Sequence, residues 1–401
     1  MAAGSTALQV GVATVDITPP VGIELSGYGS RKGKPSTSIA HPLRAEAMVV
    51  KGQEGGAWAL VTSDIIGYSA DLVARVRERA AAQTGLAPEA ILISATHTHS
   101  GPSVRKEYGN ELDDYKDELE SCLVDAIVEA NANLAPGAFE AAWTEAPDLA
   151  HNRRVVQEDG TVQNVWLDEE GSHTGYFDPT VLLVALRRPD GAIEALIVNY
   201  GCHPVTLGPS SMAISADYVG YLKDALEAAG LAQTVMFALA GAGNINPRVC
   251  IQVGAEYPKA MGEKLADIVK GAVSELKAVA AGPVASSRQP LSFVSQRKWS
   301  EQSGREQGEP LETEVMALRA GDLGAVSVPG ELFSEYARIF RDASAMPYTL
   351  VVSLANDGTG YLPVDEAMPQ GGHEVNHRAA AEGVQDPLTG AAKAALAAVT
   401  S

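Results

Sequence analysis

ILISATHTHSGP, residues 91–102, is the most informative stretch of this 401-residue chain. Its first half is a short apolar run rich in β-branched residues, and its second half is polar and ends in a Gly-Pro breaker. This order predicts a buried strand that leads into a loop. Side chains two residues apart in an extended segment point to the same side, so we expect His97 and His99 to share one face.

Two histidines at the end of a buried strand can hold a metal ion or move a proton. Ligands of α/β proteins collect at the carboxyl ends of strands, which favours a functional site here. A histidine near a strand end is also a common hydrogen-bonded structural residue. The pair alone therefore leaves both interpretations open.

The composition excludes several classes of protein. With 401 residues and 46% hydrophobic content, the chain can bury the core of one large α/β domain or of two smaller ones. Fifty acidic and 30 basic residues give a net charge of -20, which argues against nucleic acid and anionic membranes as partners. Three widely spaced cysteines without a CxxC pair argue against a disulfide framework and a thiolate zinc site.

The first 15 residues lack a basic segment followed by an apolar one, and no apolar run approaches the ~18 residues of a membrane span. We therefore expect a soluble cytoplasmic protein without stable membrane insertion. The sequence leaves open whether the chain forms a homo-oligomer.

Hydrophobic spacing and turn residues predict alternating strands and helices. Strands are expected from Gln9 to the Pro19-Pro20 stop and over residues 45–51, 58–63, 91–95, 181–186, 193–200, 234–240, 323–328 and 348–354. Helices are expected over residues 69–84, 112–131, 217–229, 256–276 and 332–341, a surface hairpin around residues 158–160, and a polar loop over 300–310. With no repeat or linker, this pattern favours one α/β domain over residues 1–401, with a mixed sheet flanked by helices and a metal site at the carboxyl ends of strands.

A glycine-rich turn at residues 241–248 follows one of these strands and could in principle cradle phosphate. It lacks the Lys-Ser/Thr of a P-loop and the spacing of a dinucleotide fingerprint. We therefore expect no nucleotide site.

Several short blocks resemble, in the same order, the N-terminal amidase domain of the neutral ceramidase family. They are THTHSGP (96–102), CHP (202–204), SADYVGY (215–221), GNINP (243–247), VPGE (328–331) and NDGTGY (356–361), preceded by DITP (16–19) and YG (28–29). THTHSGP is the most specific of them, and the resemblance covers most of the chain.

The resemblance implies one zinc ion per chain. By motif position its ligands are His97, His203, Glu331 and Tyr361. Neutral imidazoles and a carboxylate are ordinary zinc donors, and zinc lowers the pKa of a bound water so that it attacks a carbonyl carbon. Taken singly, Glu331 could instead complement a helix dipole and Tyr361 could be a packing ring.

The resemblance also implies residues that act on the substrate. His99 would stand beside the metal, and an arginine that holds a substrate oxygen maps to Arg153, with Arg154 as the neighbouring alternative. His99 and Arg153 would stabilise the oxyanion, and His99 or Tyr361 would protonate the leaving amine. The other histidines, at positions 41, 151, 173, 373 and 377, are expected to be structural or exposed.

Asn246 stands where the family has a serine cast as a nucleophile or carbonyl binder. An amide side chain cannot be acylated as a serine can, so hydrolysis would run through metal-bound water, with Asn246 at most donating a hydrogen bond. We expect neither the family's C-terminal immunoglobulin-like domain nor its secretion signal. Only 5% of residues are aromatic, which together with the acidic composition argues against ceramide itself as the substrate.

These observations predict a zinc-dependent hydrolase that cleaves the carbon–nitrogen bond of an N-acyl amide from a small or amphiphilic metabolite. A lactonase or esterase using the same metal is the alternative enzyme. A catalytically silent metal-binding relative is the alternative of another class, because Asn246 replaces the serine.

Overall fold

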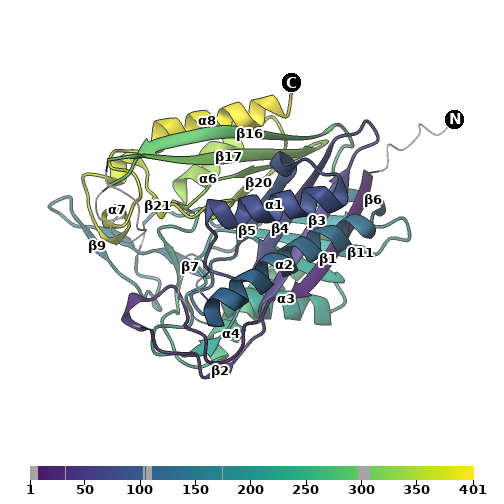
Figure 1. The fold of residues 1–401 in the computed structure, drawn as a ribbon. Coiled ribbons are helices and arrows are strands. Elements are labelled where there is room, and N and C mark those ends of the chain that lie inside the picture. The colour runs from purple at the N-terminus through teal and green to yellow at the C-terminus, as the bar shows by residue number, and fades with distance from the viewer. Residues whose placement is uncertain (1–7, 32, 103, 105–110, 174, 297–307) are drawn as a thin grey trace.

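The computed structural model describes residues 8–31, 33–102, 104, 111–173, 175–296 and 308–401 (Figure 1). Most of the polar loop predicted over residues 300–310 lies outside this range. Among the described residues, no helix is long and apolar enough to cross a membrane.

Nine strands form a mixed sheet, as predicted. Eight of them follow the hydrogen-bonded order β13-β11-β10-β6-β1-β3-β4-β5, and β15 pairs with β6. The pairs β4–β5 and β11–β13 are parallel, and the other pairs are antiparallel. The strands are β1 (Leu8–Asp16), β3 (Arg44–Lys51), β4 (Ala57–Ser63), β5 (Ile91–Ala95), β6 (Ala135–Glu145), β10 (Thr180–Arg187), β11 (Ile193–Tyr200), β13 (Thr234–Leu239) and β15 (Lys277–Ala278).

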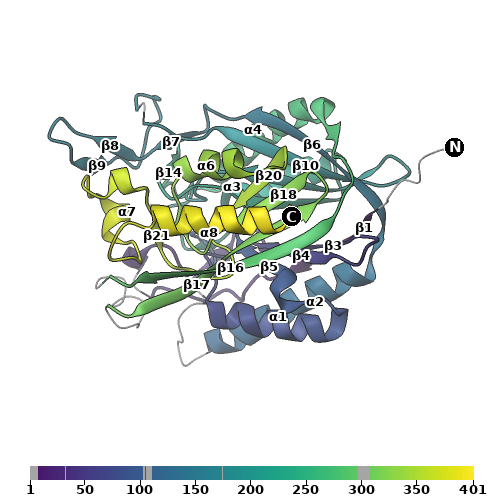
Figure 2. The same cartoon turned by 90° about the horizontal axis from the view of Figure 1, so that it is seen from above.

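Four helices pack into the hydrophobic core on one face of this sheet. They are α1 (Ala70–Thr84), α2 (Glu111–Ala132), α3 (Asp217–Ala228) and α4 (Glu256–Ala272). In Figure 2, α1 and α2 lie beside β4 and β5, and α4 lies near β6. The predicted ends of α1 are confirmed, since the Ser69 hydroxyl accepts a bond from the backbone N–H of Leu72 and Gly85 ends the helix at a φ of 72°. Alternate strand residues divide between the two faces: Val49 packs in the core under the helices, and Met48 packs in the core on the opposite side.

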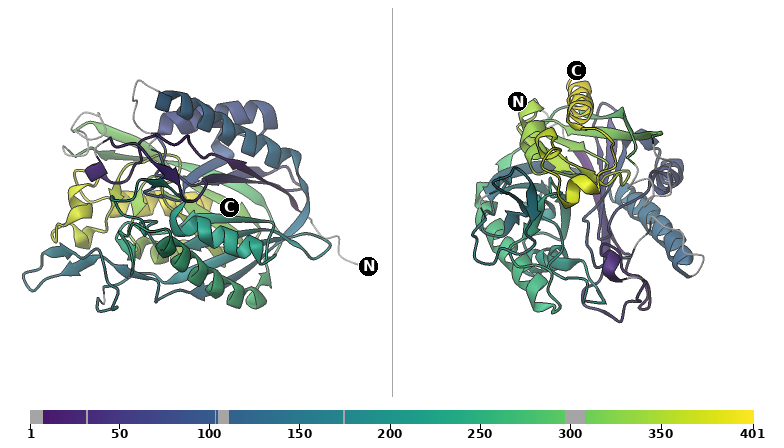
Figure 3. Two further views of the ribbon diagram at one scale, coloured as in Figure 1. Left: turned by 90° about the horizontal axis from the view of Figure 1, so that it is seen from below. Right: turned by 90° about the vertical axis from the view of Figure 1, so that its left-hand side faces the viewer.

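A second sheet covers that opposite side. Its order is β16-β17-β18-β20, with strands β16 (Val284–Val294), β17 (Pro310–Ala320), β18 (Leu323–Ser327) and β20 (Tyr348–Val352). Helices α6 (Glu335–Ala343) and α8 (Gln385–Ala398) pack on its outer face. The layers therefore run helices, sheet, sheet, helices (Figure 3). The α/β class is confirmed, and the second sheet is an addition that the sequence did not predict.

Strands β5 and β13 stand at opposite ends of the large sheet's order and yet contact each other. The segment that follows β20 joins them. The backbone N–H of Ser353 donates to Leu239 O of β13 (2.8 Å), and that of Asn356 donates to Ile93 O of β5 (2.8 Å). The loops after β5, β11, β18 and β20 consequently converge on one corner of the molecule.

Short elements frame this corner. Four two-residue or three-residue ladders pair β2 (Ser38–Ile39) with β12 (Ala213–Ile214), β7 (Ala150–Asn152) with β14 (Ile245–Pro247), β8 (Arg154–Val156) with β9 (Val162–Asn164), and β19 (Glu331–Leu332) with β21 (Tyr361–Leu362). The β8–β9 pair is the predicted hairpin. The remaining helical segments are α7 (His373–Asn376), η1 (Gly29–Arg31), η2 (Pro88–Ala90), η3 (Val273–Glu275) and η4 (Asp365–Ala367).

Candidate metal centre and active site

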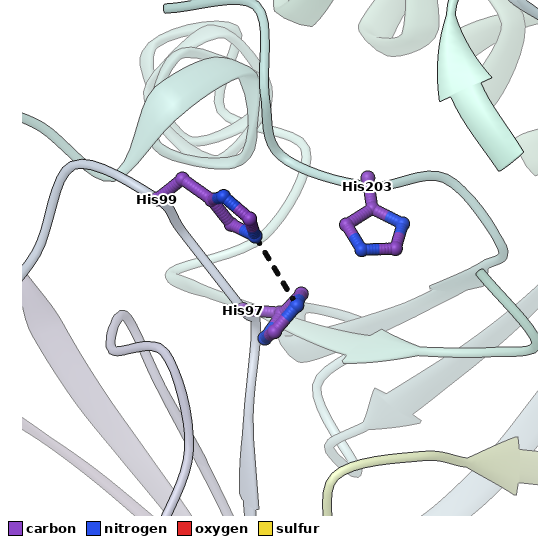
Figure 4. A group of neighbouring side chains, drawn as sticks. All are labelled: His97, His99 and His203. Carbon is purple, nitrogen blue, oxygen red and sulfur yellow. Dashed lines mark hydrogen bonds between the residues drawn. The ribbon is translucent and has the colours of Figure 1, made fainter. Parts of the chain in front are cut away.

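Three histidines meet at the corner where the loops converge. His97 and His99 follow β5, and His203 follows β11. Their nearest ring nitrogens all lie within 4.8 Å of one another, and Nε2 of His99 is 3.2 Å from Nε2 of His97 (Figure 4). The group can hold a metal ion.

His97 and His99 come together by a route that differs from the predicted one. Strand β5 ends at Ala95, and His97 has a φ of 71°, in the left-handed region that residues other than glycine rarely adopt. The backbone N–H of His97 donates to Ile65 O (2.9 Å), which helps to hold this turn. Strained backbone of this kind persists where the surroundings determine it, and it is frequent at functional sites.

His97 and His203 are oriented in the same way. Nδ1 of His97 lies 2.6 Å from Ile66 O, and Nδ1 of His203 lies 2.5 Å from Ala242 O. A carbonyl oxygen only accepts hydrogen bonds, so each Nδ1 carries the ring proton and each Nε2 presents a lone pair to the centre. Histidines that bind metals usually show this arrangement.

His99 is held differently. Its buried Nδ1 has no partner among the described residues. Its ring packs edge-on against Tyr28, with 5.0 Å between ring centroids, and against Gly27, where an added Cβ would lie 2.5 Å from the imidazole. Packing therefore orients His99, and no hydrogen bond from Nδ1 does.

Glu331 and Tyr361 stand side by side because β19 and β21 pair in the register Glu331 to Tyr361. The Glu331 carboxylate is 3.2 Å from Nε2 of His203 and 3.4 Å from Nε2 of His97. A Cβ added at Gly243 would lie 2.5 Å from the backbone oxygen of Glu331, so this approach needs a glycine. Glu331 belongs to a strand and α6 begins only at Glu335, so the helix-dipole interpretation of Glu331 is wrong.

The electrostatics of the centre favour metal donors. Burial, followed by the nearby Arg153 charge, lowers the pKa of His203 to about 4, and burial lowers the pKa of His99 well below its ordinary value. Burial alone would raise the pKa of Glu331, but His97 and His203 outweigh it and hold this pKa well below its usual range. At neutral pH the imidazoles of His203 and His99 are therefore neutral, and Glu331 is a carboxylate. Zinc and similar metals require donors in these protonation states.

Arg153 reaches the centre and Arg154 does not. Nη2 of Arg153 donates to the Tyr361 hydroxyl (3.0 Å) and to Gly243 O (2.8 Å). The guanidinium of Arg154 lies 5.4 Å from the centroid of the Phe333 ring and bonds to Glu374 and Gln370. Burial and the neighbouring Glu331 raise the pKa of Tyr361 well above its ordinary value, so the phenol keeps its proton in the metal-free centre.

Asn246 is 1% exposed, and protein groups occupy both ends of its amide. Its oxygen accepts a bond from Nη1 of Arg153 (3.0 Å). Its nitrogen donates to Trp166 O (3.2 Å) and contacts Sγ of Cys250 (3.6 Å). The side chain therefore holds Arg153 and the Trp166 loop, whereas the sequence predicted at most one donated hydrogen bond during hydrolysis.

Two residues beside the centre, Glu374 and Trp166, were not predicted from the sequence, and a third, His373, was expected to be structural or exposed. Glu374 is fully buried and binds both arginines. The Trp166 ring lies 5.1 Å from the Arg153 guanidinium, and His373 packs edge-on against Trp166 (5.3 Å) and Tyr361 (5.6 Å). One signal could have pointed to Glu374: two consecutive arginines near a metal site require a buried counter-charge.

Comparisons with known proteins identify similar sequences. The family model described as neutral/alkaline non-lysosomal ceramidase, N-terminal, matches residues 8–288. Neutral ceramidase A and neutral ceramidase B of Dictyostelium discoideum are each 25% identical to the chain, over 224 and 229 residues, which is 53% and 54% of this chain. The alignments cover 31% of each relative, so the chain matches about a third of their length.

Solved structures share the fold. The crystal structure of neutral ceramidase from Pseudomonas aeruginosa matches with a TM-score of 0.79 and 17% identity, over 97% of this chain and 73% of that one. A ceramidase complexed with C2 matches with a TM-score of 0.77 and 18% identity, over 97% and 74% of the two chains.

Proposed function

This chain belongs to the neutral/alkaline non-lysosomal ceramidase family, and on that premise we propose that it is a zinc-dependent hydrolase of an N-acyl amide. The observation that carries the proposal is the orientation of His97 and His203. Both rings donate Nδ1–H to backbone carbonyls and aim Nε2 at the Glu331 carboxylate. This donor set suits zinc.

We assign one zinc ion per chain. Its proposed ligands are His97, His203, Glu331 and Tyr361. His99 is left out because its Nδ1 lacks the outer hydrogen bond that orients the other two rings. Zinc in such a site supplies Lewis acidity and activates water for attack on a carbonyl carbon.

The chain's own residues then stabilise charge and move protons. Arg153 is buried beside Tyr361 and keeps its charge, so it stabilises the oxyanion that forms on the substrate carbonyl. His99 is neutral and takes the proton that the attacking water releases. It then gives this proton to the leaving nitrogen as the carbon–nitrogen bond breaks, which yields a carboxylic acid and a free amine.

No covalent acyl-enzyme is expected at the position of the family's serine. Asn246 is not a nucleophile, and its amide is already bonded to Arg153 and Trp166. Water is therefore the proposed nucleophile.

The proposed substrate is an N-acyl amide of a small or amphiphilic metabolite. The relatives are named as ceramidases, which supports a lipid-like amide. Trp166 and Leu167 are 36% and 44% exposed next to the Arg153 side of the centre and offer apolar surface to an acyl chain. A net charge of -20 opposes docking on anionic membranes, so we expect dispersed substrates to be favoured over ceramide in such membranes.

The test combines elemental analysis with a substrate screen on the purified protein. We expect one zinc per chain and turnover of short- and long-chain N-acyl anilides. Turnover of esters or lactones without turnover of amides would replace the amidase with the lactonase or esterase. Bound zinc without turnover of any of the three classes would make the chain a silent metal-binding relative.

A further inference from the structure

Glu374 is a buried carboxylate that the reaction outlined above does not use. It lies in α7, which follows the segment that carries Tyr361, and its side chain is 0% exposed. One carboxylate oxygen accepts a bond from Nε of Arg153 (2.7 Å), and the other accepts one from Nη1 of Arg154 (2.8 Å). The Asn164 amide donates to both oxygens, at 2.9 and 3.0 Å.

This arrangement separates two consecutive guanidinium groups. Arg153 turns toward Tyr361, and Arg154 turns toward Phe333 and the side chain of Gln370 (3.3 Å). Like charges in a buried site repel strongly unless a carboxylate lies between them. Glu374 is that carboxylate.

The geometry of Arg153 depends on this contact. Its guanidinium makes bonds on three sides: Nε to Glu374, Nη1 to Asn246, and Nη2 to both Gly243 O and Tyr361. Glu374 supplies the only carboxylate among these partners, and hydrogen bonds to a charged acceptor are the strongest of the set. Nη1 carries two N–H groups and bonds to one described acceptor, which leaves one N–H to meet a substrate oxygen.

We propose that Glu374 is a positioning residue for hydrolysis: it fixes Nε of Arg153 so that the opposite edge of the guanidinium stays at Tyr361 and the substrate carbonyl. The proposal rests on the proposed function of Arg153. Glu374 touches neither substrate nor metal, and it acts through Arg153. The Arg153 side chain is long and flexible, so it loses its fixed orientation when the partner of its Nε is removed.

A purely structural role would give Glu374 only the task of anchoring α7 to the β8–β9 hairpin. Arg154 provides the matched control for that role, because it bonds to the same carboxylate and also reaches Gln370, but it does not reach the centre. Arg154→Met removes the bonds from Arg154 to Glu374 and Gln370 and leaves the bond from Arg153 to Glu374 in place. Glu374→Gln keeps the size of the side chain and removes its charge.

The experiment measures kcat and KM for an N-acyl anilide, zinc content and thermal stability in the same zinc-loaded samples. For Glu374→Gln we expect unchanged zinc and a ~10- to 100-fold loss in kcat, the scale for removing an outer hydrogen-bond partner of a catalytic group. Glu374→Asp should recover part of this loss. Arg154→Met should lower the melting temperature as much as Glu374→Gln does and change kcat less than about twofold.

A double-mutant cycle decides whether Glu374 acts through Arg153. Once Arg153→Met has removed the guanidinium, adding Glu374→Gln should slow the reaction no further. Independent, multiplicative losses would overturn the positioning role, as would wild-type kcat in Glu374→Gln.

A binding measurement that needs no turnover distinguishes failure of the positioning role of Glu374 from failure of the proposed hydrolase function. If zinc-loaded wild type hydrolyses no amide, the proposed function fails, and binding of butyrate, a product-like carboxylate, is measured by calorimetry. Glu374→Gln should then weaken butyrate binding as much as Arg153→Met does, while Arg154→Met retains wild-type affinity. Equal butyrate affinity in Glu374→Gln and wild type would reject the positioning role on its own.

Discussion

Two buried groups of titratable side chains are neighbours at the end of β5, where Thr96 contacts the first group and His97 belongs to the second, and the two groups follow opposite rules. The first, the sealed cluster, consists of Lys223, Glu46 and Asp64. The Lys223 ammonium bonds to both oxygens of Glu46 (2.8 and 3.1 Å) and to both oxygens of Asp64 (2.9 and 3.1 Å). Thr96, which precedes His97, also donates to Asp64 (3.2 Å).

The second, the open centre, consists of His97, His99, His203 and Glu331. Its ring nitrogens face one another, and Nδ1 of His99 has no partner within the described part of the chain. In the sealed cluster the charges satisfy one another, which is how a protein tolerates charge in its core. In the open centre three imidazole Nε2 atoms and one carboxylate face a common point, and Nδ1 of His99 has no described partner, which suits an ion or substrate that supplies further interactions. The comparison predicts that mutations in the sealed cluster affect stability, whereas mutations in the open centre affect metal binding and rate.

His203→Ala should have the largest effect. It removes one oriented imidazole, so we expect zinc content to fall from about one ion per chain to none and turnover to fall to background. Elemental analysis and an amide hydrolysis assay measure the two results. The control is His41→Ala, since His41 is a buried histidine that pairs with Asp224 (2.9 Å) away from the centre. Full zinc occupancy in His203→Ala would show that His203 is not a ligand.

Lys223→Met tests the sealed cluster. It leaves the carboxylates of Glu46 and Asp64 buried without their shared cation, so the free energy of unfolding should fall by about 3–5 kcal/mol. Denaturant titration measures this loss, and the folded variant should keep its zinc. Lys270→Met, which removes a surface pair with Asp267, should cost less than about 1 kcal/mol. Equal losses in the two variants would contradict the distinction between sealed and surface charge.

Glu374→Gln gives a smaller effect that depends on pH. Burial alone would raise the pKa of Glu374, but the Arg153 charge and the Asn164 hydrogen bonds outweigh it and lower the pKa to about 2. A depressed carboxyl pKa stabilises the folded state above the ordinary value near 4.5, and this stabilisation disappears as the pH falls through 2. The shift corresponds to about 3 kcal/mol at neutral pH.

The measurement is the unfolding free energy of zinc-free wild type and Glu374→Gln from pH 7 down to pH 3. The gap between the two proteins should be constant above about pH 5 and should close as the pH falls further. A gap of the same size at pH 3 and pH 7 would mean that the Glu374 charge contributes nothing to stability.

The smallest expected effect is on the mass of the protein during turnover, which should not change because no covalent intermediate forms. Asn246 replaces the family's serine and is bonded on both sides, so intact-protein mass spectrometry during turnover should show only the unmodified mass. An acyl adduct at any residue would overturn water as the nucleophile. Asn246→Ser gives the comparison, because it restores the hydroxyl at that position.

The sequence predicted most of the large sheet and its helices because their residues alternate or recur with clear periods. It failed where the pattern was weak. No strand was predicted over residues 135–145, where β6 contains the strand-breaking pair Pro136-Gly137 near its start. Edge strand β16 exposes much of its length and contains Pro290, so it lacks the apolar alternation of a strand.

The candidate site likewise has residues that the sequence predicted and residues that it did not. The motif positions of His97, His203, Glu331 and Tyr361 led to one corner of the structure, because each stands directly after or within a strand. The partners of Arg153 could not be read from the sequence, since Glu374 lies 221 positions away and bonds to it only after the C-terminal segment has folded over β8 and β9. The left-handed turn at His97 was also invisible, since nothing in THTH indicates it.

His99→Ala is the sharpest test of the proposed hydrolase, because it distinguishes a residue that acts on substrate from one that holds the metal. We expect the variant to keep its zinc and to lose roughly 10²-fold in kcat on an N-acyl amide, the scale for removing one preorganised group. Zinc content and rate are measured on one sample of the variant and one of wild type. Loss of zinc would make His99 a ligand, and retained zinc with wild-type turnover would contradict its role in the reaction.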